Sequence, residues 1–350
     1  MMSSYLLSSV PVSFPGLGIT DISVSREAFR IGSFAIYWYG IFIVVAFAAC
    51  VILALRQSKK FRFTGDEIID YALFAIPASL IGARIYYVLS SLNEFSSDWK
   101  SIFDTRNGGL AVYGGILFAV LAVFLVAKKK KRAISSVFDF LIVYVPLGQA
   151  VGRLGNFTNQ EAFGVNTNLP WGMISPETSR YISLFCPGLD PNLPVHPTFL
   201  YEAIASCIIF ILLLLIRNKA KRPFTTVSAY CIFYGVARFL IEGIRTDSLY
   251  IGQTGLRTSQ VLSAVLVIVG LLTIVAVRYL DLKRVQNPIL EELSEKEEEK
   301  LSQYSILLEK EEIEEEVSDE DEDEGFYDDI LEEDSSSDFS DDADSDDKKD

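Results

Sequence analysis

The sequence is poor in the residues from which most metal and nucleophilic sites are built. It has a single histidine, His196, and four scattered cysteines with no Cys-x-x-Cys pair. This spacing matches no common zinc-site pattern and does not predict a disulfide framework. No P-loop, dinucleotide-binding string or metal-ligand cluster occurs either. The sequence therefore predicts no cofactor and no bound metal.

Basic residues are scarce in one part of the chain. Residues 285–350 carry 30 acidic and 5 basic side chains, a net charge of −25. Because the whole chain carries −15, residues 1–284 carry +10. A basic, apolar body suits a membrane with an anionic surface. The acidic segment cannot bury enough apolar area to offset its ordering entropy, so we expect a disordered tail from 285 to 350.

Long apolar runs are abundant. A bilayer core of about 30 Å needs about 20 apolar residues in a helix. Seven runs have this length, and they cover residues 34–55, 67–91, 109–127, 134–155, 198–216, 224–243 and 258–278. The expected fold class is an all-α membrane protein with about seven transmembrane helices, which fill a body at residues 1–284.

Basic loops follow the first, third, fifth and seventh runs. Loops of this kind stay in the cytoplasm, so we expect the N-terminus outside and the C-terminus in the cytoplasm. Residues 157–196 then form one long external segment, which is rich in Asn, Pro and Gly. A connection of this length is too long for a simple turn and predicts a small external head.

Ionisable side chains inside the apolar runs are the most informative residues. A charge at mid-bilayer costs at least about 2.5–3.5 kcal/mol on insertion scales, so such residues usually face a cavity or one another and mark functional sites. Each one taken singly is equally well explained as a helix-pinning ion pair. Their clustering near the external helix ends favours a function. They are Asp70, Arg84, Asp139, Arg153, Glu202, Arg238 and Glu242.

The sixth run ends in YGVARFLIEGIRTD, which places four polar residues on one helix stripe. They are Tyr234, Arg238, Glu242 and Arg245. Two interpretations stay open for this stripe. Either Arg238 and Glu242 satisfy only each other, or Arg238 binds an anionic substrate while Glu242 holds its guanidinium in place.

The fourth run ends in GQAVGRLGNFTNQEAFG. Arg153 and Asn156 are three residues apart and face one way on a helix. Asn159 and Glu161 follow where the helix meets the external surface. A planar guanidinium beside an amide suits a cluster of phosphate oxygens. The full string RxGNFxNxExxG is far more specific than a bare GNF.

Three shorter motifs complete the set. HPTFLYE opens the fifth run and contains His196 and Glu202. A histidine before proline is more often a structural cap than a catalyst. LAVYGGILF carries Tyr113 before two glycines, and YWYG carries Tyr39 near the external interface, where aromatic residues gather.

Together, RLGNFTNQEAFG, HPTFLYE, YGVARFLIEGIRTD, NGGLAVYGG and FRIGSFAIYWYG resemble motifs of the bacterial prolipoprotein diacylglyceryl transferases, over residues 25–280. The resemblance implies a seven-helix enzyme of the bacterial inner membrane with a small periplasmic head. Such enzymes move diacylglyceryl from phosphatidylglycerol to the lipobox cysteine of a prolipoprotein signal peptide, and glycerol-1-phosphate leaves. The implied partners are these two substrates and the lipid bilayer, with no nucleic acid.

The resemblance also implies a site, in which two arginines surround the lipid phosphate. The implied catalytic residues are Arg153, Arg238, Glu161, Tyr113 and His196. The implied substrate-binding residues are Tyr39, Arg153, Asn156, Gly164, Tyr234, Arg238, Glu242 and Glu202. Two guanidiniums in a cavity of low dielectric would stabilise the charge that accumulates on the departing phosphate. The nucleophile is the substrate's own thiolate.

The chain departs from the family pattern at one position. It has Tyr113 before Gly114 and Gly115 where many members have His-Gly-Gly. A phenol with an unperturbed pKa near 10 is a poor base at neutral pH. His196 and Glu202 are the alternative proton acceptors, and the residues alone do not decide among the three.

Two other functions agree with parts of the sequence. Buried charges also line the ion pathways of transporters. Transporters often show two related halves, however, and no such duplication is evident here. A non-catalytic scaffold is the other alternative, in which the acidic tail would bind basic cytoplasmic partners.

Overall fold

The computed structural model describes residues 9–95, 99–103, 108–252, 254–286 and 296–307. The chain divides into two units, residues 1–278 and 279–350. In the second unit, residues 296–307 are helical. They lie in the tail predicted to be disordered, where Glu and Lys favour helix. The other tail residues, 287–295 and 308–350, lie outside the described residues.

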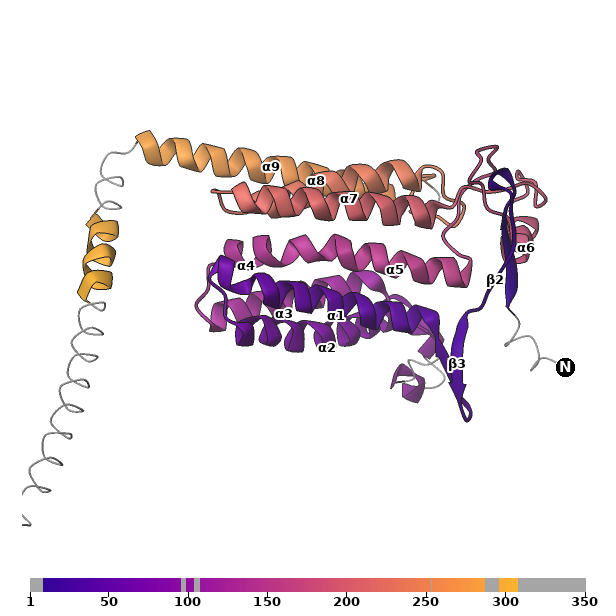
Figure 1. Cartoon of the computed structure of the whole chain (residues 1–350), viewed down its shortest axis with the longest axis horizontal. Helices are drawn as coiled ribbons and strands as arrows, with labels where there is room; N and C mark the ends of the chain where they lie inside the picture. The colour runs from indigo at the N-terminus through magenta and orange to yellow at the C-terminus, as the bar shows by residue number, and fades with distance from the viewer. Residues whose placement is uncertain (1–8, 96–98, 104–107, 253, 287–295, 308–350) are drawn as a thin grey trace, which may run out of the picture. The chain divides into compact units, whose positions relative to one another are not determined.

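Two antiparallel hairpins open the first unit (Figure 1). The first pairs β1 (Val10–Phe14) with β2 (Ile19–Val24), with the 3₁₀ helix η1 (Pro15–Leu17) between them. The second pairs β3 (Glu27–Ile31) with β4 (Phe34–Tyr37). The sequence analysis predicted no strands here. It also placed the first apolar run from residue 34, whereas the helix begins at Trp38, directly after β4.

The rest of the first unit is mostly helical, as predicted. Its membrane-length helices and neighbouring segments are α1 (Trp38–Ser58), η2 (Lys59–Phe61), α2 (Gly65–Ser90), η3 (Leu92–Phe95), η4 (Trp99–Phe103), α3 (Val112–Lys129), α4 (Ile134–Leu141), η5 (Ile142–Tyr144), α5 (Val145–Asn159), α7 (Thr198–Lys219), α8 (Thr225–Glu242) and α9 (Thr258–Gln286). The predicted run at 134–155 comprises α4, η5 and α5, and Pro146 lies in the first turn of α5, where proline is tolerated.

Six helical stretches among the described residues are long and apolar enough to cross a membrane. They are Trp38–Phe61, Gly65–Ser90, Val112–Lys129, Ile134–Asn159, Thr198–Lys219 and Thr258–Asp281. The protein is therefore a multi-pass membrane protein. The sixth predicted run, residues 224–243, forms α8, but this helix carries Arg238 and Glu242 and is not among the six. The number seven stays a prediction.

Helix α5 occupies a central position, where it packs against α1 and α7, while α2 pairs with α3 and α7 with α8 (Figure 1). A buried cluster that includes Phe63, Tyr71, Phe140 and Tyr144 joins α1, α2, α3, α4 and η5. The joined ends of these helices lie remote from the hairpins (Figure 1). There Arg217 of α7 lies 4.3 Å from the centre of the Phe61 ring, and its guanidinium donates to the Tyr144 hydroxyl at 3.1 Å. These contacts fix the α7 register, and with it the position of the residues at the opposite end.

The opposite end of the bundle carries a small head with its own core. The head contains residues 160–197, including α6 (Pro176–Phe185), and the first hairpin. Its core is formed by Val12, Met173, Ile182 and Val195, all of which are buried. A backbone bridge between Ser13 and Ile174 joins the hairpin to the head. The predicted head is therefore a compact structure, and it includes N-terminal residues that the sequence analysis had not assigned to it.

Candidate active site

The arginine of the RxGNF motif lies near the end of α5. The Arg153 guanidinium donates to the Asn156 side chain at 3.0 Å, as their shared helix face predicts. Asn156 in turn donates to a Glu161 carboxylate oxygen at 2.8 Å, and Asn159 donates to the same oxygen at 3.2 Å. The helix ends at Asn159, and the left-handed backbone of the next residue, Gln160, turns the chain so that Glu161 faces back toward these amides.

A carboxylate on α7 gathers three arginines. Glu202 is only 4% exposed. One of its oxygens forms an ion pair with Arg153, and the other binds both Arg238 and Arg245, the latter at 3.1 Å. The three arginines come from α5, α8 and the loop after α8. The two arginines predicted to bind phosphate, Arg153 and Arg238, therefore lie within reach of a single small anion.

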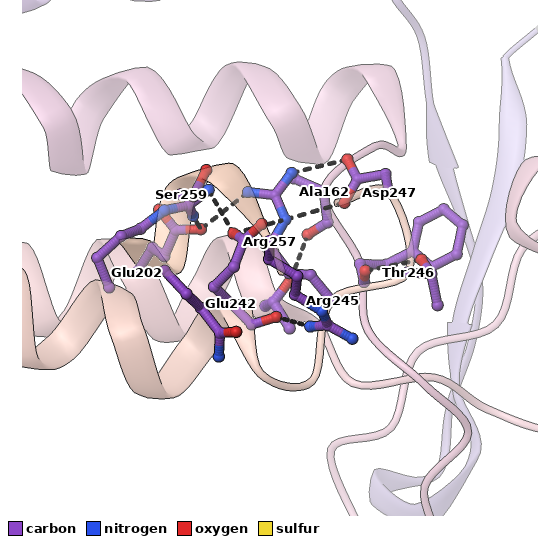
Figure 2. A network of polar contacts seen from close by, with 12 residues as sticks. Ala162, Glu202, Glu242, Arg245, Thr246, Asp247, Arg257 and Ser259 are labelled. Carbon is purple, nitrogen blue, oxygen red and sulfur yellow. Dashed lines mark hydrogen bonds and ion pairs between the residues drawn. The ribbon is translucent and has the colours of Figure 1, made fainter. Parts of the chain in front are cut away.

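Two further acids complete the cluster. Glu242 pairs with Arg238 at 2.6 Å, which confirms the predicted i,i+4 contact. Arg245 binds both carboxylate oxygens of Asp247, at 2.9 and 2.7 Å, and lies 3.9 Å from Glu242 (Figure 2). We call Arg153, Glu202, Arg238, Glu242, Arg245 and Asp247 the arginine cluster. Its three cations and three anions balance, so its burial leaves no net charge unpaired.

Arg245 stays charged despite its burial. Burial alone lowers the pKa of its guanidinium, but the hydrogen bonds and charge of Asp247, with Glu202 and Glu242, raise the pKa overall. Arg257, at the start of the segment leading into α9, donates to the backbone oxygen of Glu242 (Figure 2). This bond ties the end of α8 to the next helix.

Gly164, the last residue of the signature, has a structural role. Its N–H donates to the His196 oxygen at 2.8 Å, and it forms an antiparallel bridge with Arg245. A side chain at this position would place a Cβ 2.6 Å from the Ile244 oxygen. Only glycine permits so close an approach, and the approach places Arg245 beside Glu202.

The three predicted tyrosines approach the cluster from different helices. Tyr234 of α8 lies near enough to Tyr113, Arg153, Glu202 and Arg238 to interact electrostatically with each of them. Its ring stacks on Tyr230, with ring centres 5.3 Å apart. Tyr39 of α1 packs against α5 at Gly155, where a Cβ would lie only 2.2 Å from its ring.

His196 lies in the head. Its Nδ1 atom is 3.0 Å from the Tyr201 hydroxyl, which also accepts a hydrogen bond from the Trp171 indole at 2.7 Å. Burial lowers the pKa of His196, so its ring is neutral at neutral pH. No hydrogen bond or ion pair joins its ring to the arginine cluster in the part of the chain that the structure describes. The geometry matches a structural role.

A cavity of about 1120 Å³ opens beside the arginine cluster. Among its lining residues are Tyr39, Glu161 and Asp247, and the cluster therefore forms part of one wall through Asp247. Pockets for small molecules typically have volumes of about 300–1,000 Å³, so this cavity has room for a larger substrate.

The site residues predicted from the sequence did not include Arg245, Asp247 or Arg257. Arg245 was placed on the stripe of the sixth run, but α8 ends at Glu242, and the residue reaches the cluster through the turn that follows. Asp247 lies two residues further along. The only sequence signal for the Arg245–Asp247 pair was the spacing of two residues between them. This spacing does not show whether Asp247 binds Arg245 or is an acid on the surface.

The fold and the cluster define a class: a multi-pass membrane protein with a buried, charge-balanced arginine site next to an open cavity. No group of three or more His, Cys, Asp or Glu side chains that could hold a metal ion occurs within the described ranges. The chemistry available here is electrostatic stabilisation of an anion by guanidiniums.

Comparisons with known proteins assign the family. The model of the prolipoprotein diacylglyceryl transferase family matches residues 26–276. A phosphatidylglycerol–prolipoprotein diacylglyceryl transferase of Finegoldia magna is 39% identical over 250 residues, which are 71% of this chain and 94% of that protein. The same-named protein of Clostridioides difficile is 39% identical over 269 residues, 77% of this chain and all of that protein. This chain belongs to the prolipoprotein diacylglyceryl transferase family.

The contacts of Glu202 predict its contribution to stability. Glu202→Gln removes the buried anion that three partly buried guanidiniums share. Breaking a buried ion pair in this way costs about 3–5 kcal/mol. We expect a clearly lower melting temperature in detergent. Glu177→Gln is the control, because its ion pair with Arg26 at 3.5 Å is partly exposed and such pairs contribute about 0–1 kcal/mol. Equal melting temperatures for the two variants would contradict the central role of Glu202.

Proposed function

We propose that this protein transfers the diacylglyceryl group of phosphatidylglycerol to the cysteine thiol of prolipoproteins. The relatives that cover most of the chain carry the names of both substrates. The observation that carries the proposal is the shared carboxylate: Arg153 and Arg238 bind the two oxygens of Glu202. Two guanidiniums that hold one carboxylate are also placed to hold one phosphate.

In the reaction, the thiolate sulfur attacks the diacylglyceryl carbon that carries the phosphate ester. A carbon–sulfur bond forms, the carbon–oxygen bond breaks, and glycerol-1-phosphate leaves with the bonding electrons. Negative charge grows on the departing phosphate, where Arg153 and Arg238 stabilise it. Glu242 and Glu202 hold these guanidiniums in position before the lipid arrives, so little reorganisation is needed during the reaction.

The thiol proton needs an acceptor near the cavity. Both oxygens of Glu202 are engaged by arginines. His196 contacts Tyr201 within the head. Glu161, in contrast, lines the cavity, is held by two side-chain amides, and has no cationic partner among the described residues. We therefore assign proton acceptance to Glu161, with Tyr113 beside the site as a hydrogen-bonding group.

The placement in the cell follows from the charge pattern. We propose that the protein lies in the bacterial inner membrane, with its head and arginine cluster on the outer side and its basic loops in the cytoplasm. The same proposal divides the chain into a catalytic body at residues 1–284 and an acidic cytoplasmic tail at 285–350, which takes no part in the chemistry.

The arginine assignment is tested with a lipobox peptide and phosphatidylglycerol in detergent. Mass spectrometry should show a diacylglyceryl mass gain with the unchanged protein and no membrane gradient. Arg153→Ala and Arg238→Ala should each lower the rate by about 100-fold or more, as loss of one preorganised electrostatic donor does. Arg56→Ala is the control, because Arg56 is exposed and lies in the last turn of α1. This variant should keep full activity. Full activity in both cluster variants would refute the assignment.

Glu161 is tested by its neutral isostere. Glu161→Gln keeps the side-chain volume but cannot accept a proton, and we expect kcat to fall by about 100-fold or more, as for lost general-base catalysis. The KM for phosphatidylglycerol should change little, because the arginines remain. Asp21→Asn, an exposed acid of the head, serves as control. An unchanged kcat would exclude Glu161 as the proton acceptor.

Replacement of the acidic tail tests both the orientation of the protein in the membrane and the proposal that the tail takes no part in catalysis. Residues 285–350 are replaced by green fluorescent protein, which becomes fluorescent only on the cytoplasmic side. We expect fluorescent bacteria and unchanged transferase activity in their membranes. Dark cells that contain the fusion would overturn the orientation, and loss of activity with normal insertion would show that the tail belongs to the catalytic unit.

A further inference from the structure

One wall of the cavity is a β-strand. All four residues of β4, Phe34–Tyr37, line it. The other lining residues include five of α6 and residues 159–163, which begin at the last residue of α5. We call this space the β4 groove. Its volume of about 1120 Å³ exceeds the typical range for small-molecule pockets, about 300–1,000 Å³, and suits a segment of polypeptide.

The strand in this wall has a free edge. Within the described residues, β4 pairs only with β3, in a two-stranded sheet. The outer edge of such a strand presents N–H and C=O groups that are available to pair with an added extended chain. Strand addition of this kind is a recurring mode of peptide recognition, in which main-chain hydrogen bonds supply affinity and side-chain pockets supply specificity. The backbone of β4 is thus suited to an extended peptide.

The lining side chains agree with a peptide ligand. Aromatic rings of Phe34, Tyr37, Tyr181 and Phe185 supply apolar contact area. Arg180 also lines the groove and has no ion pair among the described residues, so it can bind a carbonyl or an acidic side chain of the ligand. A mixture of aromatic surface and a few polar groups is typical of peptide-binding sites.

The groove leads to the arginine cluster. Tyr39, two residues after β4, and Glu161 both line it, and Asp247 of the cluster forms part of its wall. A chain lying along β4 would therefore bring its next residues to the reacting groups. The apolar stretch of a signal peptide precedes the modified cysteine and belongs in the membrane. The head side of the site must then receive the residues that follow the cysteine.

We propose that the β4 groove binds the extended segment that follows the modified cysteine of a prolipoprotein, as a third strand on the edge of β4. The inference rests on the proposed function for the identity of the partner. A strand of four residues spans about 13 Å at about 3.3 Å per residue, so about four residues after the cysteine should contribute to binding.

The test measures binding without turnover. Two fluorescent lipobox peptides are compared by anisotropy with the full-length protein in detergent: one ends directly after the cysteine, and the other continues for six residues. We expect the longer peptide to bind about tenfold more tightly, the difference made by about 1.4 kcal/mol of added contacts. Ala35→Trp places a large side chain in the groove and should abolish the advantage. Ala28→Trp, on β3 and away from the cavity lining, should retain it.

A second variant guards against misfolding. Ala35→Pro removes one backbone N–H of β4, and proline is tolerated on an edge strand. It should weaken the longer peptide while the melting temperature and the binding of the short peptide stay unchanged. Equal affinities of the two peptides for the unchanged protein, or an intact length advantage in both Ala35 variants, would overturn the docking proposal. A higher KM for phosphatidylglycerol alone in Ala35→Trp would assign the groove to lipid and overturn it as well.

The docking and transferase proposals fail in different ways. A length-dependent affinity that Ala35→Trp removes supports docking even if no diacylglyceryl product forms, and the missing product would then count against the proposed function alone. Normal product formation with no dependence on peptide length would retain the function and exclude the groove.

Discussion

The site depends on one buried carboxylate. Three guanidiniums from separate parts of the chain repel one another, and they would not stay together in an apolar setting without an anion among them. Glu202 supplies that anion from α7, and Glu242 and Asp247 balance the remaining charge. The site is therefore arranged around the shape of a small oxyanion. In the proposed function, a lipid phosphate would meet guanidiniums whose positions are set before it binds.

This arrangement joins the head to the helices. Residues 163–165 of the head run beside residues 244–246, and the bridge at Gly164 positions Arg245 against Glu202. The same loop carries Asp247 to the cavity wall. The head therefore also has a role in positioning the site residues. It contributes the backbone contacts that complete the electrostatics of the site.

The sequence predicted much of the body because bilayer chemistry imposes strong patterns. Long apolar runs and buried charges indicated the membrane helices, and the stripe containing Arg238 and Glu242 indicated their ion pair. The hairpins at residues 10–37 were missed because strands of four to six residues leave only short alternations, and β4 merges with the apolar run of α1. The three-way contact of Glu202 was also beyond prediction, since it depends on how α5, α7 and α8 pack together.

The direct passage of β4 into α1 has a mechanical consequence. Tyr37 ends the strand and Trp38 begins the helix, so no flexible linker separates them. Tyr39 follows within the first helical turn, with its ring against Gly155 on the helix that carries Arg153. A displacement of β4 would therefore move the first turn of α1 directly. If both proposals hold, one stretch of backbone would contact both substrates, and communication between them would need no separate switch.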